Sequence, residues 1–428
     1  MSLGESWGHF PKIETEVREL WWLSELSKSG VDPFLPVGLG RSYGDSALLS
    51  RAKGSMLSIG RCGRFVSFDA TNRILEVEAG CSIDEVLKWC LPMGYFLPVV
   101  PGTSHVTLGG AIANDIHGKN HHEQGTFGRS VLGFELWRNG EEPIWCDRKT
   151  QAGLFAATIG GLGLTGVIGR VRLSLIPIAG KGLIGQKSIR FGCLLEGAEA
   201  LESLDREYPM TVAWIDMASA KIGRGVAMGG EFIEGRCESS NRRSLSIPIC
   251  APNFLLNRLA IRGFNTLYSA TRKEGDAELG FRSFFFPLDG VENWGKLYGK
   301  RGFLQYQCVV PMNALDALLE LQSLVAHSGQ GAFLSVLKKF GSLESPGVLS
   351  FPFAGWTLAM DFPNEGASTL ALFSRLDDVV KDAGGRLYPA KDARMSGEFF
   401  RDSYPEWIEL EQVRDERITS EFWERVKA

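Results

Sequence analysis

Hydrophobic residues in the first 180 positions gather in short runs that alternate with glycine-rich turns. The runs that are typical of strands are 34–37, 56–59 and 74–77. Residues 15–26 show the apolar spacing of an amphipathic helix. Ser82 and Glu85 have the spacing of a capping box, which predicts a helix that begins here and ends near Gly94. The pattern therefore predicts many short strands and few helices in this region.

After residue 180 glycine thins out and longer periodic segments appear. The predicted strands are 281–286, 302–310, 332–338, 355–361 and 386–391. The predicted helices are 198–206, 314–326, one that Ser368 caps and that ends at Gly384, and a charged C-terminal tail. Residues 235–271 are polar, contain prolines and lack a clear period, which predicts a long loop.

Three glycine-rich blocks carry the first chemical signal. They are 36–45 (PVGLGRSYGD), 101–122 and 158–169. Glycine permits close approach of the backbone to a ligand, and successive N–H groups bind anions. The first block reads G-x-G-x-x-x-G, which is not the Rossmann spacing. Three such loops suit one large ligand that carries a diphosphate and a heterocycle, so we expect a nucleotide cofactor.

Composition and charge exclude several other classes. The formal net charge of −4 predicts no nucleic-acid partner. No signal peptide is visible and no apolar run approaches ~20 residues, which predicts a cytoplasmic protein with peripheral membrane contact at most. The eight cysteines form no C-x-x-C pair, so we read them as reduced thiols. The proline-broken stretch 247–256 is the candidate for touching a lipid or membrane, with an ordinary surface loop as the alternative.

Two of the chemically interesting residues are ambiguous from spacing alone. His117 and His121 have the i, i+4 spacing of a metal pair, but only Asp115 and His122 stand nearby as further ligands. We therefore expect no metal. His117 alone fits a buried structural histidine equally well, and spacing alone favours Lys391 as a solvated lysine at a strand end.

The glycine blocks and the C-terminal motif together resemble a known family. The strings are VGLGRSYGD, PGTSHVTLGGAIANDIHGKNHH, GGLGLTGVI and GRLYPAKD. They are similar to the vanillyl-alcohol oxidase / p-cresol methylhydroxylase superfamily of FAD enzymes, above all to its branch that oxidises polyprenyl-phosphoryl ribose. The resemblance covers most of the chain and is weakest over 235–271.

This resemblance implies an α+β fold and a division of the chain. A PCMH-type FAD-binding domain would comprise 1–180 and be completed by 386–428. A substrate-binding domain with an antiparallel sheet would comprise 181–385. The fall in glycine density near Ile178 independently favours the first boundary.

The resemblance also implies site residues. The FAD contacts carry over to Pro36, Val37, Gly38, Leu39, Gly40, Arg41, Ser42, Tyr43, Gly44, Asp45, Ser46, Gly102, Thr107, Leu108, Gly109, Gly110, Asn114, Asp115, Ile116, His117, Ile168 and Tyr388. The catalytic positions carry over to Lys391, His117 and Tyr388, and the substrate positions to Lys119, Gln305, Gln307, Lys338 and Lys391.

Two positions depart from the family pattern. Many relatives attach the flavin through a histidine in the first loop, where this chain has Arg41, so we expect non-covalent FAD. The ribose-oxidase branch carries Asn-x-Cys before Asp-Phe-Pro, where this chain has Thr357 and Ala359. The second departure leaves the identity of the sugar open.

The implied reaction is oxidation of the C2′ hydroxyl of a polyprenyl-phosphoryl pentose to the keto sugar. In the family a short-chain reductase partner then completes an epimerisation. The alternative is an aldonolactone or alditol oxidase acting on a soluble polyol. Such enzymes usually carry the first-loop histidine and a C-terminal H-W-x-K, and this chain has only Asn293-Trp294-Gly295-Lys296. A non-enzymatic flavin-binding subunit is the third reading, against which Lys119 and Lys391 argue.

Overall fold

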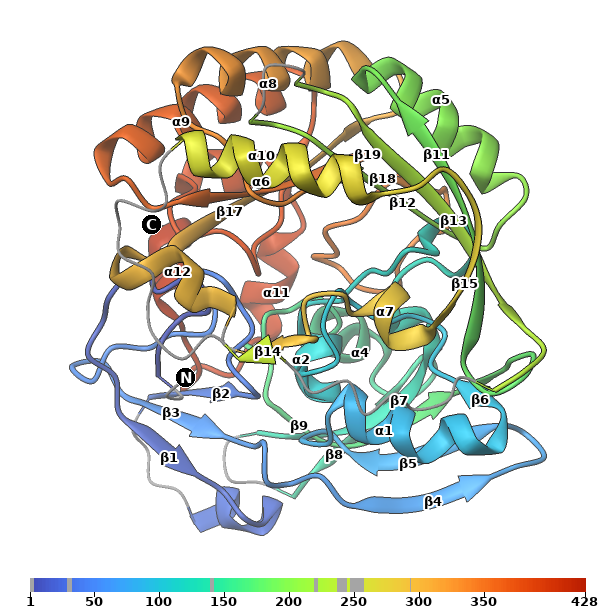
Figure 1. Ribbon diagram of the computed structural model, residues 1–428. Coiled ribbons are helices and arrows are strands. Elements are labelled where there is room, and N and C mark those ends of the chain that lie inside the picture. The colour runs from blue at the N-terminus through green and yellow to red at the C-terminus, as the bar shows by residue number, and fades with distance from the viewer. Residues whose placement is uncertain are drawn as a thin grey trace.

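The computed structural model describes residues 4–28, 33–138, 142–218, 222–236, 245–246, 258–292 and 294–428. The stretch 247–256, which we singled out for lipid contact, lies outside the described residues. Figure 1 shows the first third of the chain forming the lower part of the molecule and the middle of the chain forming the upper part. Among the described residues, no helix has the length and apolar character needed to cross a membrane.

Two larger sheets form most of the lower part. The smaller is parallel and has the order β1 (Val17–Glu19), β3 (Ser55–Ser58), β2 (Phe34–Val37). The larger is antiparallel, with the order β4 (Phe65–Asp69), β5 (Ile74–Glu78), β9 (Val167–Ser174), β7 (Val131–Trp137), β8 (Ile144–Asp147). The predicted strands of this region are thereby confirmed to within one residue.

Local sequence signals position the first two helices. The predicted capping box is confirmed, because the hydroxyl of Ser82 accepts from the N–H of Glu85 and the carboxylate of Glu85 accepts from the N–H of Ser82. Helix α1 (Ile83–Cys90) then passes into a short 3-10 turn that ends at Gly94, whose φ is 81°. Helix α2 (Leu108–Ala113) begins where Thr107 accepts from the N–H of Gly110, and this helix leads into the loop around His117.

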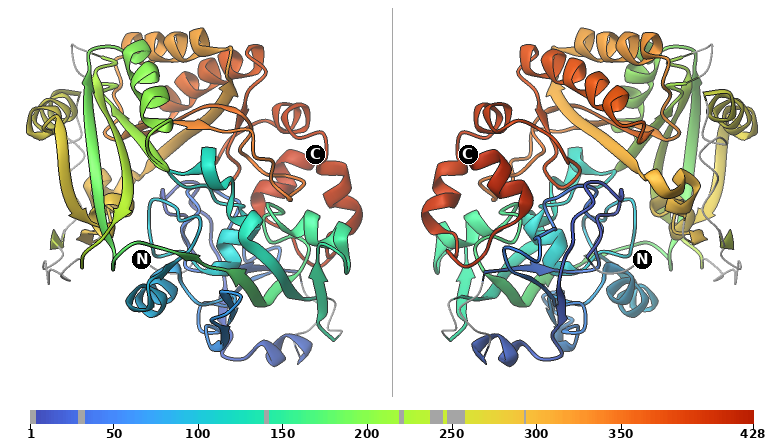
Figure 2. Two further views of the ribbon diagram at one scale, coloured as in Figure 1. Left: turned by 90° about the vertical axis from the view of Figure 1, so that its right-hand side faces the viewer. Right: turned by 90° about the vertical axis from the view of Figure 1, so that its left-hand side faces the viewer.

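One eight-stranded sheet dominates the upper part. Its order is β15 (Gly275–Gly280), β11 (Leu183–Phe191), β13 (Gly225–Ile233), β12 (Met210–Ile215), β18 (Ser335–Phe340), β19 (Gly355–Pro363), β17 (Phe303–Pro311), β20 (Arg386–Leu387). Every pairing within it is antiparallel. Helices α5 (Leu194–Asp205), α8 (Leu315–Ser328) and α9 (Ala367–Asp382) pack on one face, and Figure 2 shows α6 (Arg258–Thr271) on the other side of the sheet.

Four predicted elements are wrong. Residues 15–26 form β1 and a 3-10 helix (Leu23–Lys28), because pairing with β3 overrides the helical spacing. Residues 281–286 form helix α7 (Phe281–Phe285), because a short phenylalanine-rich segment does not distinguish a strand from a buried helix. The predicted loop 235–271 contains α6. Helix α9 begins after Gly366, not after Ser368.

The C-terminal segment returns to the first loop. After β20 come α10 (Gly397–Ser403), α11 (Trp407–Val413) and α12 (Glu421–Lys427). The guanidinium of Arg425 donates to Asp45 at 2.8 Å and to Asp392 at 3.0 Å. Phe34 forms a parallel bridge with Ile418. Residues distant in sequence thus hold the loop 36–46 in place.

Candidate active site

A cavity of about 1420 Å³ lies between the glycine loops and one face of the eight-stranded sheet. Typical small-molecule pockets measure roughly 300–1,000 Å³, so this one has room for a large ligand and a second molecule beside it. One wall is loop backbone from the lower part. The opposite wall consists of side chains from the sheet and from α6 and α7.

The first glycine loop meets the second at close range. A Cβ added to Gly38 would lie 2.2 Å from Oγ1 of Thr107, so glycine is required for the two loops to touch. Gly40 has a φ of 63°, and a Cβ added there would meet open space. The guanidinium of Arg41 donates to the carbonyl of Leu39 at 2.9 Å and lies 4.2 Å over the ring of Trp7. Burial lowers the pKa of Arg41.

The residues of this wall fit FAD. Gly40 and Gly102 leave open space on the side where a Cβ would stand, so a flat or extended ligand has no side chain to displace. The hydroxyl of Ser46 is buried at the cavity wall without a hydrogen-bond partner in the described chain. A buried polar atom of this kind calls for a ligand partner. Backbone N–H groups and a free hydroxyl are the donors that a diphosphate needs.

His117 stands where the second glycine block meets the sheet. Its Nε2 lies 2.9 Å from Nε2 of Gln307 and its Nδ1 lies 3.2 Å from the ammonium of Lys338. Burial, followed by the charge of Lys338, lowers the pKa of His117 well below its usual value. A neutral ring that accepts from Lys338 at Nδ1 carries its proton at Nε2. The oxygen of the Gln307 amide must then face the ring, which fixes the amide orientation.

Two half-buried lysines flank this histidine. The ammonium of Lys119 donates to the carbonyls of Phe284 at 2.7 Å and Phe285 at 3.3 Å. Lys338 also contacts the carbonyl of Gly118 at 3.5 Å. Burial and the charge of Lys338 lower the pKa of Lys119 to about 7, and burial lowers the pKa of Lys338 to about 8. In the part of the chain that the structure describes, neither ammonium pairs with a carboxylate.

The half-buried Lys391 and the buried Asp361 form a second charged group. The ammonium of Lys391 lies 3.7 Å from the ring centroid of Tyr43. Burial lowers the pKa of Lys391, and the carboxylate of Asp361 opposes this shift. Burial raises the pKa of Asp361, whose Oδ1 accepts from the amide of Gln305 while its Oδ2 has no hydrogen-bond partner in the described chain. A lysine with a lowered pKa is available as a neutral amine, and therefore as a base.

Tyr388 has a positioning geometry. Its hydroxyl donates to the carbonyl of Asn114 at 2.9 Å and its ring stacks on Phe351 at 4.6 Å. Burial raises its pKa above the usual value, so the phenol stays protonated. Its N–H donates to the carbonyl of Gln307 at 3.0 Å. The ring thereby joins the second glycine block to the sheet.

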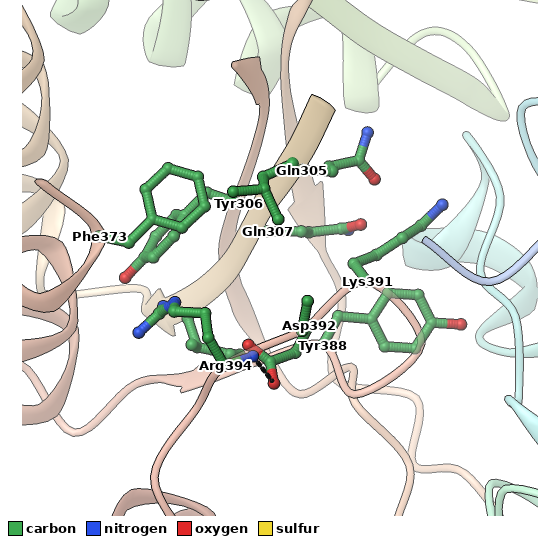
Figure 3. A pocket seen from close by; sticks show the side chains of 11 residues that line it. Gln305, Tyr306, Gln307, Phe373, Tyr388, Lys391, Asp392 and Arg394 are labelled. Carbon is green, nitrogen blue, oxygen red and sulfur yellow. Dashed lines mark hydrogen bonds between the residues drawn. The ribbon is translucent and has the colours of Figure 1, made fainter. Parts of the chain in front are cut away.

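The alternation of side chains along β17 (Phe303–Pro311) directs its two glutamines toward the cavity. Gln305 and Gln307 are two residues apart on β17 and point to the same side, together with Lys391 and Tyr388 (Figure 3). Tyr306 lies between the glutamines and points the opposite way, where its ring contacts Phe373 of α9 at 5.1 Å. The pleat of β17 therefore separates a polar side facing the cavity from an aromatic side facing the core.

Most predicted site residues line this cavity. They are Pro36, Val37, Gly38, Leu39, Gly40, Arg41, Ser42, Tyr43, Ser46, Gly102, Thr107, Gly109, Gly110, Asn114, Ile116, His117, Lys119, Ile168, Gln305, Gln307, Lys338, Tyr388 and Lys391. The side chains predicted to be catalytic and substrate-binding thus converge on one space, although their chain positions span almost 280 residues.

Four predicted FAD contacts lie outside the cavity lining and have structural contacts instead. A Cβ on Gly44 would stand 1.6 Å from the carbonyl of Asp392, so this glycine lets the C-terminal segment approach. Asp45 pairs with Arg425, and Leu108 is buried in the core. Asp115 is buried, accepts from the N–H of Gly128 at 2.8 Å, and accepts from two serine hydroxyls. These residues shape the loops from behind.

Several lining residues carried no motif signal. They include Trp7, Asp289, Trp214, Tyr268 and Arg272. The alternation of side chains along a strand could have revealed Asp361, because it lies two residues after Ala359 on β19 and therefore on the same face of the sheet. His121 does not share the position of His117, because its Nδ1 accepts from the N–H of Gly341 at 3.1 Å. Among the described residues no group of three or more His, Cys, Asp or Glu is arranged to hold a metal ion.

Comparison with known proteins shows the family to which this chain belongs. A family model described as an FAD binding domain matches residues 10–147. Decaprenylphosphoryl-β-D-ribose oxidase of Mycolicibacterium smegmatis is 36% identical over 404 residues, which cover 88% of this chain and 85% of the relative. L-gulonolactone oxidase of Mus musculus is 28% identical over 39% of this chain and 36% of the relative. Cytokinin dehydrogenase 8 of Oryza sativa subsp. japonica is 33% identical over 25% of this chain and 20% of the relative.

The matches agree with the site. The FAD binding domain model covers the first two glycine blocks, and the match to the ribose oxidase covers 88% of the chain. The chain is an FAD-dependent oxidoreductase with a PCMH-type FAD-binding domain of mixed helix and antiparallel sheet. It belongs to the family of FAD-dependent oxidases that includes decaprenylphosphoryl-β-D-ribose oxidase.

Proposed function

We propose that this enzyme oxidises a secondary hydroxyl of a phosphorylated sugar, the C2′ hydroxyl of a polyprenyl-phosphoryl pentose such as ribose. The product is the keto sugar. The relative named decaprenylphosphoryl-β-D-ribose oxidase supports this substrate class. We also propose that the reaction is the first half of an epimerisation, completed by a short-chain reductase partner.

The observation that carries the proposal is the pair Lys119 and Lys338. Two ammonium groups on half-buried side chains that repel each other are unfavourable unless an anion joins them. Each has a lowered pKa caused by burial, and neither has a carboxylate partner among the described residues. A phosphate supplies that anion and accepts hydrogen bonds from both ammonium groups. A neutral polyol or lactone leaves the two charges unpaired.

The remaining polar groups suit the reacting sugar. When bound, FAD supplies the acceptor for a hydride, at N5 of its flavin ring. The C2′ hydrogen leaves with its electron pair, the hydroxyl proton passes to the amine of Lys391, and the carbon becomes a carbonyl. Gln305 and Gln307 hydrogen-bond the sugar hydroxyls and set which carbon is presented. His117, held neutral by burial and by the charge of Lys338, orients the sugar at the same place.

We propose that FAD is held without a covalent bond. Arg41 occupies the position where relatives carry the tethering histidine, and a guanidinium forms no such bond. Denaturation in acid should release all the yellow colour into the supernatant. Colour that stays with the precipitated protein would contradict this.

We further propose that the FAD-binding domain comprises 1–180 and 386–428 and that the substrate-binding domain comprises 181–385. We also propose a cytoplasmic location with peripheral membrane contact.

The second candidate is an aldonolactone or alditol oxidase. The match to L-gulonolactone oxidase favours it, but that match spans 39% of this chain. The test is anaerobic mixing of purified holoenzyme with farnesylphosphoryl ribose, L-gulonolactone or xylitol, followed by flavin absorbance. We expect bleaching with the phosphorylated sugar alone. Bleaching only by the lactone or the polyol would overturn the proposal in favour of the second candidate.

A further inference from the structure

One face of the eight-stranded sheet lines the cavity, and at β17 this face carries the polar side chain of Gln307. Gln307 of β17 stands directly opposite Ala359 of β19. Ala359 in turn stands opposite Val336 of β18, and Val336 opposite Trp214 of β12. Directly opposed residues on neighbouring strands point to the same side. One continuous row therefore leads from the amide that contacts His117 to an indole three strands away.

Beyond β12 the same face is an apolar wall. Val212 lies two residues before Trp214 and stands opposite Met228 of β13. Ala277 and Leu279 of β15 also line the cavity. Val212 and Trp214 are buried, Met228 and Leu279 are half-buried, and Ala277 is exposed. The wall thus opens to solvent at the edge strand of the sheet.

Helix α6 closes this wall from the side opposite the sheet. The ring of Tyr268 packs against Trp214, with the ring centroids 4.8 Å apart. Its hydroxyl accepts from the guanidinium of Arg272 at 2.6 Å, and both side chains line the cavity. Figure 1 shows α6 lying across the strands of the upper sheet. The part of the cavity that lies beside α6 and these strands, which we call the channel, is mostly apolar, and it belongs to the same cavity as Lys119 and Lys338.

We infer that this channel binds the hydrocarbon tail of the lipid-linked substrate and releases its far end at β15. The inference rests on the proposed function, because a phosphate held by Lys119 and Lys338 is esterified to the tail and directs it along the row. Neighbouring strands lie about 4.8 Å apart, so the path from β18 to β15 is about 19 Å long. This length holds several isoprene units before the chain reaches solvent.

The experiment separates tail binding from turnover. Isopentenyl, geranyl, farnesyl and geranylgeranyl monophosphates, which carry no sugar, are titrated into holoenzyme by calorimetry. The corresponding phosphoribose esters are then used in the bleaching assay. We expect at least a roughly tenfold gain in affinity from the C5 to the C15 compound, because each added carbon is buried against apolar wall. We expect a smaller gain from C15 to C20, where the tail reaches the edge strand.

Two variants test the route. Met228→Gln and Leu279→Gln each place an amide on the wall, so they should reduce the gain from C5 to C15 and leave the C5 affinity unchanged. The control is Glu278→Gln, which changes the neighbouring exposed residue on the same strand, whose side chain points to the opposite face. It should behave as wild type.

The outcomes separate this inference from the proposed function. Equal affinity for all tail lengths, with bleaching by phosphoribose esters intact, would overturn the channel alone. A length dependence that survives in both Gln variants would also overturn it, because the tail would then leave by another path. Monophosphate binding that follows the prediction, without bleaching by any phosphoribose ester, would support the channel and sink the proposed function.

Discussion

The two walls of the cavity recognise their ligands by different means. The wall built from residues 36–46 and 101–118 offers mainly backbone and glycine, and it fits FAD because side chains are missing there. The opposite wall offers side chains from the sheet and from the segments beside it, among them the base Lys391 and two lysines, Lys119 and Lys338, that pair with no carboxylate among the described residues. Backbone recognition is encoded by neighbours along the chain, whereas the opposite wall depends on strand register. The contrast explains why the cofactor is the easier half of the function to infer.

Lys391→Met should produce the largest effect. Removing the amine should slow flavin bleaching by about a thousandfold, within the range of a general base, while FAD stays bound. Stopped-flow absorbance measures the rate, and the flavin spectrum reports occupancy. The control is Lys381→Met, an exposed lysine paired with Glu398 and Asp402. Bleaching at the wild-type rate in Lys391→Met would show that Lys391 is not the base.

Lys338→Gln should come next. Loss of a charged hydrogen bond to phosphate should weaken binding of the phosphorylated substrate about a hundredfold. Its match is Lys339→Gln, the next residue on β18, which points to the other face and lies near Glu202 and Asp205. Equal losses in the two variants would show that the strand is disturbed and that no phosphate site exists at Lys338.

Gly38→Ala tests the backbone wall. The added methyl group would stand 2.2 Å from Oγ1 of Thr107 and push the two loops apart. We expect FAD to bind about tenfold more weakly, a change of about 1.4 kcal/mol. Fluorescence of released FAD measures this. Gly263→Ala is the control, because a Cβ at Gly263 meets open space. Wild-type affinity in Gly38→Ala would mean that the loops tolerate separation.

Asp361→Asn should give the smallest effect, visible in the pH profile. The neutral amine of Lys391 is lost as pH falls through its pKa, so bleaching slows on the acid side. The carboxylate of Asp361 raises that pKa. Its removal should move the acid limb about one unit lower, while Asn still accepts from Gln305. Bleaching rates between pH 5 and 9 measure the shift. An acid limb of the pH profile that stays in place or moves to higher pH would show that Asp361 does not raise the pKa of Lys391.

The predictability of the molecule follows the same division. The three glycine blocks were found because a close backbone approach leaves a local composition. Lys391 and Gln305 were placed by resemblance, since spacing alone favoured a solvated strand-end lysine. Trp214 could not be found, because its role depends on which strands become neighbours. Helix α7 was predicted as a strand because a phenylalanine-rich segment of six residues has no decisive period. Trp7 is held at the cavity by a backbone hydrogen bond to Ser42, which no sequence signal indicates.

The contacts between Asp45 and Arg425, and between Phe34 and Ile418, have a consequence for biosynthesis. The first glycine block leaves the ribosome almost 380 residues before the arginine that fixes it. Tyr388 and Lys391 also arrive late. The nascent chain therefore has no finished flavin site during most of its translation. The closed flavin site can form only after Arg425 has been synthesised, and a premature stop anywhere before α12 yields a chain that lacks this closure, even when every glycine block is present.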